Sequence, residues 1–263
     1  MIPSLRSRAH IFPSFCLTCS PPKRSFRPSS LPVKSLSTTT MSASGQLIEH
    51  IVLFKAKDGT DPSLVNAMVS SLNGLVSLDP VLHLTAGPVL QTRSSLFAFT
   101  HMLHSRYRSK DDLAAYSAHP SHMGVVKECV LPICEDIMAV DWVADCVPET
   151  LVPPPGSAIK VSFLKLKEGL GNGAKNEVMG VIEGIKDGFA KIEQVTCGEN
   201  FSPARAKGFS IASLAVFRSV EEMEAAAADE EAVNLRKEKV REYLDGVIVV
   251  DYMVPEQPTS ASL

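Results

Sequence analysis

The chain has 263 residues and a formal net charge of −3, and 45% of its residues are hydrophobic. This near-neutral balance gives no sign of a nucleic-acid binder, and no apolar run reaches the roughly 18 residues needed to span a bilayer. We therefore expect a soluble protein, with no nucleic-acid and no membrane partner, that is long enough for two modest domains.

The first forty residues have the composition of a targeting segment. They contain lysine, arginine, serine and proline but no acidic residue, which is typical of an organellar transit peptide. Met41 offers a second possible start of translation. We expect residues 1–44 to be a disordered targeting segment.

The other end of the chain carries a competing signal. It closes on Ala261-Ser262-Leu263, which resembles the peroxisomal tripeptide Ser-Lys-Leu except that Ser262 replaces the lysine. We expect a flexible tail over residues 255–263 that is read by the peroxisomal import receptor. The peroxisome is the favoured location, the chloroplast is the alternative, and an ordinary tail without a signal stays open.

Two halves of the chain repeat each other at an offset of 110 residues. Residues 51–59 (IVLFKAKDG) match residues 161–169 (VSFLKLKEG) in apolar pattern, both lysines, the acidic residue and the glycine. The other matches are 108–113 with 218–223, 140–142 with 250–252 and, at an offset of 111, 84–87 with 195–198. We therefore expect a duplicated domain, with copies over residues 47–146 and 157–254 and a proline-rich linker over 147–156.

Both copies show the same order of predicted elements. An apolar, β-branched run over residues 48–56 predicts a strand, and Asp61-Pro62 predicts the start of a helix that reaches about Leu78. Ser109, followed by two acidic residues, predicts the cap of a second helix. The remaining predictions are strands at 81–90, 96–105 and 136–143, helix from 109 to about 118, and helix from there to about 134.

The order β-α-β-β-α-β places the chain in the α+β class, as tandem ferredoxin-like domains. Each copy has helices on only one face of its sheet, yet its strands are apolar on both faces. We expect the copies to stack sheet to sheet and form an intramolecular dimeric α/β barrel. The residues expected on one face are Val52, Phe54, Phe97 and Phe99, and those on the other are Ile51 and Leu53.

Several motifs together resemble the stress-responsive dimeric α/β-barrel (A/B barrel) proteins of plants. They are His50 with the apolar run after it, Phe99-Thr-His101, Tyr116-x-x-His119-Pro-x-His122 and Val140-Asp141-Trp142. The resemblance covers roughly residues 47–254. It implies the pairing of two such domains, here within one chain, and leaves a homo-oligomer open. One kind of relative, olivetolic acid cyclase, closes a linear polyketide by aldol chemistry without a cofactor.

That chemistry needs a base that removes a proton and a donor that polarises a carbonyl, roles that imidazole and phenol can fill. Tyr116 and His119 share a helix face, and we expect the following proline to turn His122 towards the same cavity. By the resemblance, His122 is the base and Tyr116 the donor, with His119 beside them. We expect His50 on the first strand and His101 on the third to line the floor of the cavity as ligand-binding residues, with Asp141 orienting an imidazole.

Two positions depart from the cyclase pattern. Leu72 stands where the relative has a tyrosine, and Ile133 stands near the place of a tryptophan, so we expect a differently shaped and less polar pocket. The histidine-proline pair also has a purely structural interpretation, in which it ends a helix and both imidazoles bind backbone carbonyls.

Two stretches of the first copy bear on a metal. His119 and His122 have a spacing that zinc ligands use, but no acidic residue or cysteine of the same stretch completes a set. The resemblance suggests magnesium (Mg2+) at the end of the first helix, bound largely by main-chain oxygens. The matching residues are Asn73, Val76, Ser77 and Asp79. We expect no cofactor for the chemistry itself.

The second copy retains the fold pattern but loses the site. Its residues at the matching positions are Lys160, Ile211, Ala226, Asp229 and Ala232, and only Asp251 is retained. Two functions stay open. In the first, a stress-response protein binds a small apolar or polyketide-like molecule in the first domain, with cofactor-free cyclase-type acid–base chemistry. In the second, it is a non-catalytic structural or interaction protein without a ligand site.

Overall fold

The computed structural model describes residues 46–185 and 191–256. The expected targeting segment and the Ala261-Ser262-Leu263 signal lie outside these residues, so both stay predictions, as does the location. No helix of the described part is long and apolar enough to cross a membrane.

The first copy has the predicted order of elements, including the separate helix after Pro120. Its strands are β1 (Ile48–Ala56), β2 (His83–Arg93), β3 (His101–Tyr107) and β4 (Cys134–Val143). Its helices are α1 (Pro62–Gly74), α2 (Lys110–Ala118) and α3 (Pro120–Val125), followed by the short turns η1 (Leu75–Ser77) and η2 (Val126–Val130) after α1 and α3. The η2 turn is π-helical.

The second copy repeats this order. Its strands are β5 (Ala158–Leu166), β6 (Ile192–Glu199), β7 (Ile211–Phe217) and β8 (Leu244–Met253), and its described helices are α4 (Asn172–Glu183), α6 (Val220–Ala227) and α7 (Glu230–Arg241). A 3-10 turn, η3 (Pro203–Arg205), lies between β6 and β7. The duplicated β-α-β-β-α-β arrangement is confirmed.

The predicted helix caps are present. Asp61 Oδ1 accepts a hydrogen bond from the backbone N–H of Ser63 at 2.8 Å, and Ser109 Oγ accepts from Asp112 N at 3.0 Å. Such side chains satisfy amide groups that the first helical turn leaves unpaired. Polar residues that interrupt the apolar pattern therefore mark where these helices begin.

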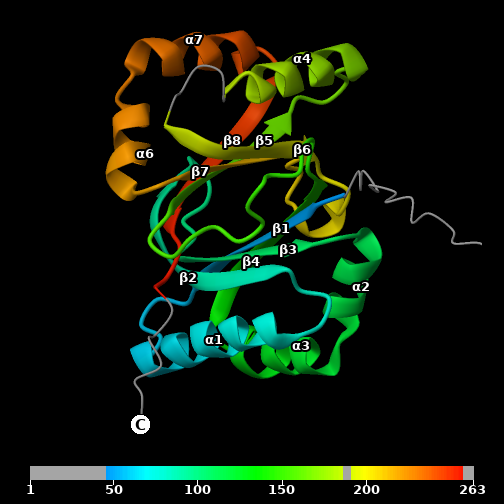
Figure 1. Ribbon diagram of the computed structural model, residues 1–263, viewed down its shortest axis with the longest axis vertical. Coiled ribbons are helices and arrows are strands. Elements are labelled where there is room, and N and C mark those ends of the chain that lie inside the picture. Colours follow the sequence, from blue (N-terminus) through cyan, green and yellow to red (C-terminus); the bar gives the residue numbers. More distant parts are fainter. Residues whose placement is uncertain (1–45, 186–190, 257–263) are drawn as a thin grey trace, which may run out of the picture. The chain divides into compact units, whose positions relative to one another are not determined.

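The two copies share one sheet with the strand order β4-β1-β3-β2-β8-β5-β7-β6 (Figure 1). They do not only stack, as expected, but also join edge to edge through the β2–β8 ladder. At the other end of the strand order, β4 meets β6, where Phe201 N donates to Asp141 O at 2.9 Å. A Cβ at Gly198 would collide there with the carbonyl oxygen of Val143. Both edges are thus covered, which removes unpaired strand groups from solvent.

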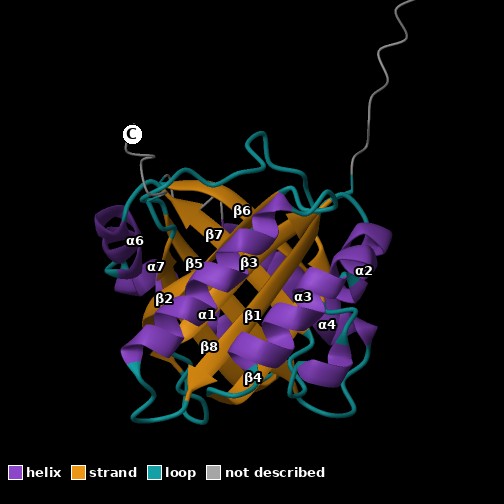
Figure 2. Cartoon of the chain, turned by 90° about the horizontal axis from the view of Figure 1, so that it is seen from below, coloured by secondary structure: helices purple, strands orange, loops and turns teal. Residues whose placement is uncertain are grey.

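Side chains of both copies fill the space enclosed by this sheet. Ile51 and Leu53 of β1 pack in one cluster with Ile159 and Phe163 of β5, all fully buried. The helices cover the opposite face, as Figure 2 shows for α1 and α3 over the strands of the first copy. The predicted pairing of the two copies around a common core is confirmed.

One part of the face assignment was wrong. Val52 and Phe54 face the helices, but Phe99 packs with Ile51 and Leu53 in the shared core, and Phe97 lies against it. The reason is that β3 starts only at His101. Residues before it are not in a strand, so the alternation of faces does not extend to them.

A polar cluster lies inside the shared core at one place. Glu49 accepts hydrogen bonds from Arg106 Nη2 at 2.9 Å, His104 Nε2 at 2.7 Å and Thr196 Oγ1 at 3.0 Å. Glu49, His104, Arg106 and Thr196 are fully buried. Burial raises the pKa of Glu49, but the attraction of Arg106 and His104 outweighs it and lowers that pKa. Glu49 is therefore an ionised carboxylate held by both copies.

The same cluster fastens the linker. Arg106 Nη1 donates to the carbonyl oxygen of Leu151 at 2.9 Å, and Gln194 Nε2 donates to that of Thr150 at 2.9 Å. The linker therefore does not simply span the distance between the copies, because side chains of both copies bind its backbone.

We expect a fragment of residues 45–147 to self-associate or aggregate. Without the second copy, Ile51, Leu53 and Met102 would lie on an open apolar sheet face, and each Å² of such surface costs roughly 25 cal/mol in water. Sedimentation velocity of the fragment beside the intact chain measures this. A stable, well-folded monomer would show that the first copy does not need its partner.

Candidate functional site

A buried imidazole–carboxylate pair lies on the helix-facing side of the first copy. His50 of β1 stands directly opposite Asp141 of β4, and His50 Nδ1 hydrogen-bonds Asp141 Oδ1. Burial raises the pKa of Asp141, but His50 and a hydrogen bond to Ser202 lower it. An ionised carboxylate only accepts, so His50 Nδ1 carries the proton and its Nε2 points away from Asp141.

Aromatic rings connect this pair to the helix junction. The ring centres of His50 and Tyr116 are 6.4 Å apart, those of Tyr107 and Tyr116 5.3 Å, and those of Tyr116 and His122 4.6 Å. Burial raises the pKa of both tyrosines, so both phenols stay protonated. The first copy thus brings His50, Asp141, Tyr116 and His122 together.

The histidine-proline stretch forms a junction between two helices. Helix α2 ends at Ala118, His119 is extended with ψ of 134°, and Pro120 opens α3. His119 Nδ1 accepts a hydrogen bond from Ser121 N at 3.2 Å, so this imidazole serves as the helix cap. The bend turns His122 back onto Tyr116.

His122 has the features of a base at neutral pH. Its Nδ1 donates to the carbonyl oxygen of Ser117 at 3.0 Å, so in the neutral ring Nε2 has no proton. Burial lowers the pKa of His122, although the bond to Ser117 works in the opposite direction. The ring therefore stays neutral at pH 7, with Nε2 able to accept a proton.

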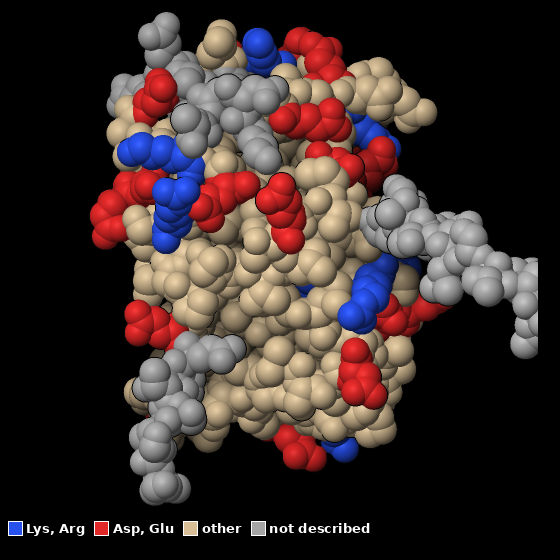
Figure 3. All heavy atoms as spheres, viewed as in Figure 1, with Lys and Arg blue, Asp and Glu red and all other residues tan. Residues whose placement is uncertain are grey.

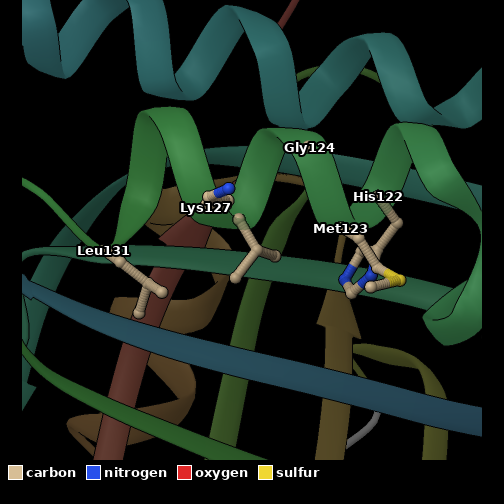
Figure 4. A pocket seen from close by; sticks show the side chains of 6 residues that line it. His122, Met123, Gly124, Lys127 and Leu131 are labelled. Carbon is tan, nitrogen blue, oxygen red and sulfur yellow. The ribbon is translucent and has the colours of Figure 1, made fainter.

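A surface hollow of about 350 Å³ lies along α3 and η2 and reaches His122. Figure 4 shows His122 and Met123 together at one end of it, Leu131 at the other and Lys127 between them. Met123 and Leu131 are 58% and 56% exposed. Single π-helical turns such as η2 occur often at functional sites. Apolar surface and a half-buried imidazole thus meet at this hollow.

The second copy contributes a segment to this site. Asn200 Oδ1 accepts from the backbone N–H of Asp141 at 3.2 Å, and Ser202 hydrogen-bonds the Asp141 carboxylate. Arg205 lies close enough to Asp141 and His122 for its charge to act on both. This segment was not predicted from the sequence. The sequence does contain one signal for this segment. The offset between matching residues of the two copies changes from 111 back to 110 between Gly198 and Arg218.

Comparisons with known proteins agree with this tandem arrangement. The stress responsive A/B barrel domain matches residues 48–144 and again residues 159–254. The chain belongs to the stress-responsive A/B barrel family. One stress-response A/B barrel domain-containing protein of Arabidopsis thaliana is 56% identical over 234 residues, 89% of each chain. A second protein of that plant, also named for this domain, is 49% identical over 80% of this chain and 97% of its own.

A solved structure supports the fold. The crystal structure of an anthrone oxidase-like protein aligns with a TM-score of 0.57 over 84% of this chain and 98% of its own, with 14% identity. At that identity the likeness shows the fold alone. An A/B barrel built from two copies in one chain is therefore the architecture of this protein.

Not every predicted residue lies in the A/B barrel site. His101 is on the same sheet face as His50 but stands opposite Phe54, whereas His50 stands opposite Ser105. Four strand residues separate them, or roughly 13 Å. His101 Nδ1 instead hydrogen-bonds Thr100 Oγ1 at 2.9 Å. Leu72 and Ile133 are both buried between helices and sheet in the first copy.

The second A/B barrel copy has an ion pair where the first has its imidazole. Lys160 Nζ donates to Asp251 Oδ1 at 2.5 Å, and Arg93 of the first copy reaches Asp251 Oδ2 at 2.7 Å. No imidazole or phenol replaces Tyr116 and His122 there, because the matching residues are alanines. Within the described chain, the imidazole and phenol groups of the candidate site thus come from the first copy.

Among the described residues, neither metal prediction coincides with a converging group of His, Cys, Asp or Glu side chains. The donor group that the described residues do bring together is Asp145, Glu183 and Cys197, which includes neither His119 nor His122. At the end of α1, Asn73 Oδ1 accepts from Ala86 N at 2.8 Å and Ser77 Oγ donates to Gly74 O at 2.9 Å. A magnesium site would have to rely on main-chain oxygens at Asn73, Val76, Ser77 and Asp79, and it stays a prediction.

Proposed function

We propose that the first copy binds a small apolar or polyketide-like molecule and carries out cofactor-free acid–base chemistry on it. The observation that carries the proposal is the contact chain from the buried His50–Asp141 pair through Tyr116 to His122, at an apolar hollow. Such a combination of perturbed titratable groups at one place is typical of functional sites.

The reaction begins with proton removal. His122 Nε2 accepts a proton from a carbon beside a carbonyl group. The electron pair of the broken C–H bond forms a C=C bond, and the π pair of the carbonyl group moves to its oxygen. The Tyr116 hydroxyl donates a hydrogen bond to that oxygen as its negative charge develops. The enolate carbon then bonds to a second carbonyl carbon of the same molecule. The alkoxide that this forms takes the proton back from His122.

Access to Tyr116 passes His122. Tyr116 is 1% exposed, and the His122 ring packs against it. The His122 side chain is half-buried and is held by a hydrogen bond to Ser117 O, so rotation of this ring costs less than movement of the buried tyrosines. We therefore assign two roles to His122: it is the base, and rotation of its ring opens access to Tyr116.

Replacing His122 with alanine should lower the rate of enolisation of benzoylacetone by about 100-fold, the usual contribution of a general base. Tyr116→Phe should lower it too, because the hydrogen-bond donor is lost. The rate is followed by the absorbance of the enol, together with urea unfolding of each variant. Lys160→Ala, at the position of the second copy that matches His50, should leave the rate unchanged.

A non-catalytic structural role is the second candidate, since His119 caps a helix and His122 binds a backbone carbonyl. It predicts a different result. The parent protein would then not accelerate enolisation or bind the diketone, and His122→Ala would cost about 1–3 kcal/mol of stability by leaving buried groups unpaired. An inactive parent protein together with this loss of stability would contradict the catalytic proposal.

A further inference from the structure

The segment between β6 and β7 is fixed on the first copy where the candidate site lies. Asn200 pairs with Trp142 in an isolated bridge, and the bonds of Asn200 and Phe201 to the Asp141 backbone hold it on β4. Lys110 of α2 adds a contact, with its ammonium 4.2 Å from the centre of the Phe201 ring. Arg205 follows in this anchored segment, and its neighbour Ala206 is buried in the shared core.

Each copy has an arginine near an aspartate of the other copy, and the two arginines differ in their partners. Arg93, at the end of β2, reaches across to the second copy and forms an ion pair with Asp251 at 2.7 Å. Arg205, in η3 after β6, lies within electrostatic reach of Asp141 of the first copy, which already pairs with His50. Arg205 is exposed and, among the described residues, has no ion pair of its own. Its guanidinium therefore remains available for a ligand.

The charge of Arg205 acts on the site. Burial is the main reason for the low pKa of His122, and Arg205 adds to it. Burial raises the pKa of Asp141, and Arg205 is among the charges that lower it again. The guanidinium thus lies within electrostatic reach of both groups.

We propose that Arg205, carried by the second copy, binds a carboxylate of the molecule held by the first copy, so that the ligands are small organic acids with an apolar body. The inference rests on the proposed function of the site. Arginine presents a planar fork of donors that matches a carboxylate and forms two charge-assisted hydrogen bonds with it. The apolar hollow beside His122 would then take the remainder of the molecule.

The preference for an organic acid depends on groups at the site and not on the charge of the whole surface. On the face shown in Figure 3, acidic and basic side chains are interspersed without a broad area of one sign. The formal net charge of the chain is −3, so its overall field does not concentrate anions. The preference for an acid must then come from individual groups at the site, and Arg205 is the group placed to provide it. A second role follows for the duplication: the site residues of the first copy would work with a specificity residue of the second.

Calorimetric titration with cinnamate and cinnamamide tests the inference, because the two probes share a shape and differ in charge. We expect the intact protein to bind cinnamate at least tenfold more tightly than cinnamamide. Arg205→Ala and Arg205→Gln should remove this difference by weakening cinnamate alone, by about tenfold or more, as expected for a lost charge-assisted bond. Arg93→Ala, which removes the arginine that pairs with Asp251 at the second copy, should keep the preference.

The other outcomes are informative as well. Equal binding of both probes, or equal weakening of both by Arg205→Ala, would overturn the role of Arg205 while benzoylacetone turnover still supports the site. If neither probe binds but the diketone reacts, the acid class is wrong and the site stands. If the diketone does not react and nothing binds, the proposed function and this inference fall together.

Discussion

Replacing Glu49 with alanine should lower the free energy of unfolding by about 3–5 kcal/mol, because it leaves the buried Arg106 guanidinium without its counter-ion. Both side chains are fully buried and are joined at 2.9 Å. Desolvation of a charge in such a place is offset only by its partners. Urea unfolding of the intact chain, followed by the fluorescence of Trp142, its one tryptophan, measures the loss.

The second copy supplies a matched control. At the positions of Glu49, His104 and Arg106 it has Ile159, Leu214 and Val216, all fully buried. A triple variant with Glu49→Ile, His104→Leu and Arg106→Val should therefore be more stable than Glu49→Ala, since it removes the whole charged group instead of one partner. A loss below about 1 kcal/mol for Glu49→Ala would mean that water or other groups compensate Arg106.

Acidification from pH 6.5 to 4.5 should cost about 2–3 kcal/mol of stability through His83. Burial, together with the charges of His104 and Arg106, lowers the pKa of His83 to about 2. The native ring therefore stays neutral, while histidine in the unfolded chain titrates near 6.5. Below that pH the unfolded state binds one proton more, so stability falls by about 1.4 kcal/mol for each pH unit.

His83→Gln should remove most of this slope. Gln194 occupies the matching position of the second copy, so a glutamine has a precedent in this fold, and it does not titrate. Stability at several pH values between about 7 and 4.5 is to be compared for the two proteins. Because the pKa of His104 is also lowered by burial, a smaller slope of the same sign should remain. Parallel curves for variant and parent would assign the acid sensitivity elsewhere.

Much of the fold is readable in single stretches of sequence. The repeat at an offset of 110, the alternating apolar residues of 48–56 and the caps Asp61 and Ser109 depend on local periodicity and local hydrogen bonds. The face assignment was wrong for residues that lie before the start of a strand. Phe97 and Phe99 were assigned to a strand that begins only at His101, because the side chains alone do not show where a backbone leaves the sheet.

For the candidate site, the sequence by itself determined which residue types stand in the first copy and that the second lacks them. His50 and Asp141 come together because the pairing of β1 with β4 places them opposite each other, and Tyr116 and His122 because a proline follows His119. Only the tertiary structure decided that His101 lies away from them, since strand register is set by pairing across the whole sheet.

Only the tertiary structure shows which residues of the two copies contact each other. A strand pattern shows that Glu49 shares a face with Ile51, but not that Thr196 and Gln194 of the other copy lie across the core from it. Likewise, nothing local to residues 200–205 shows that they bind the backbone of Asp141. Such contacts depend on which sheet edges meet, and this is set by burial of the whole apolar surface of both copies rather than by any one segment.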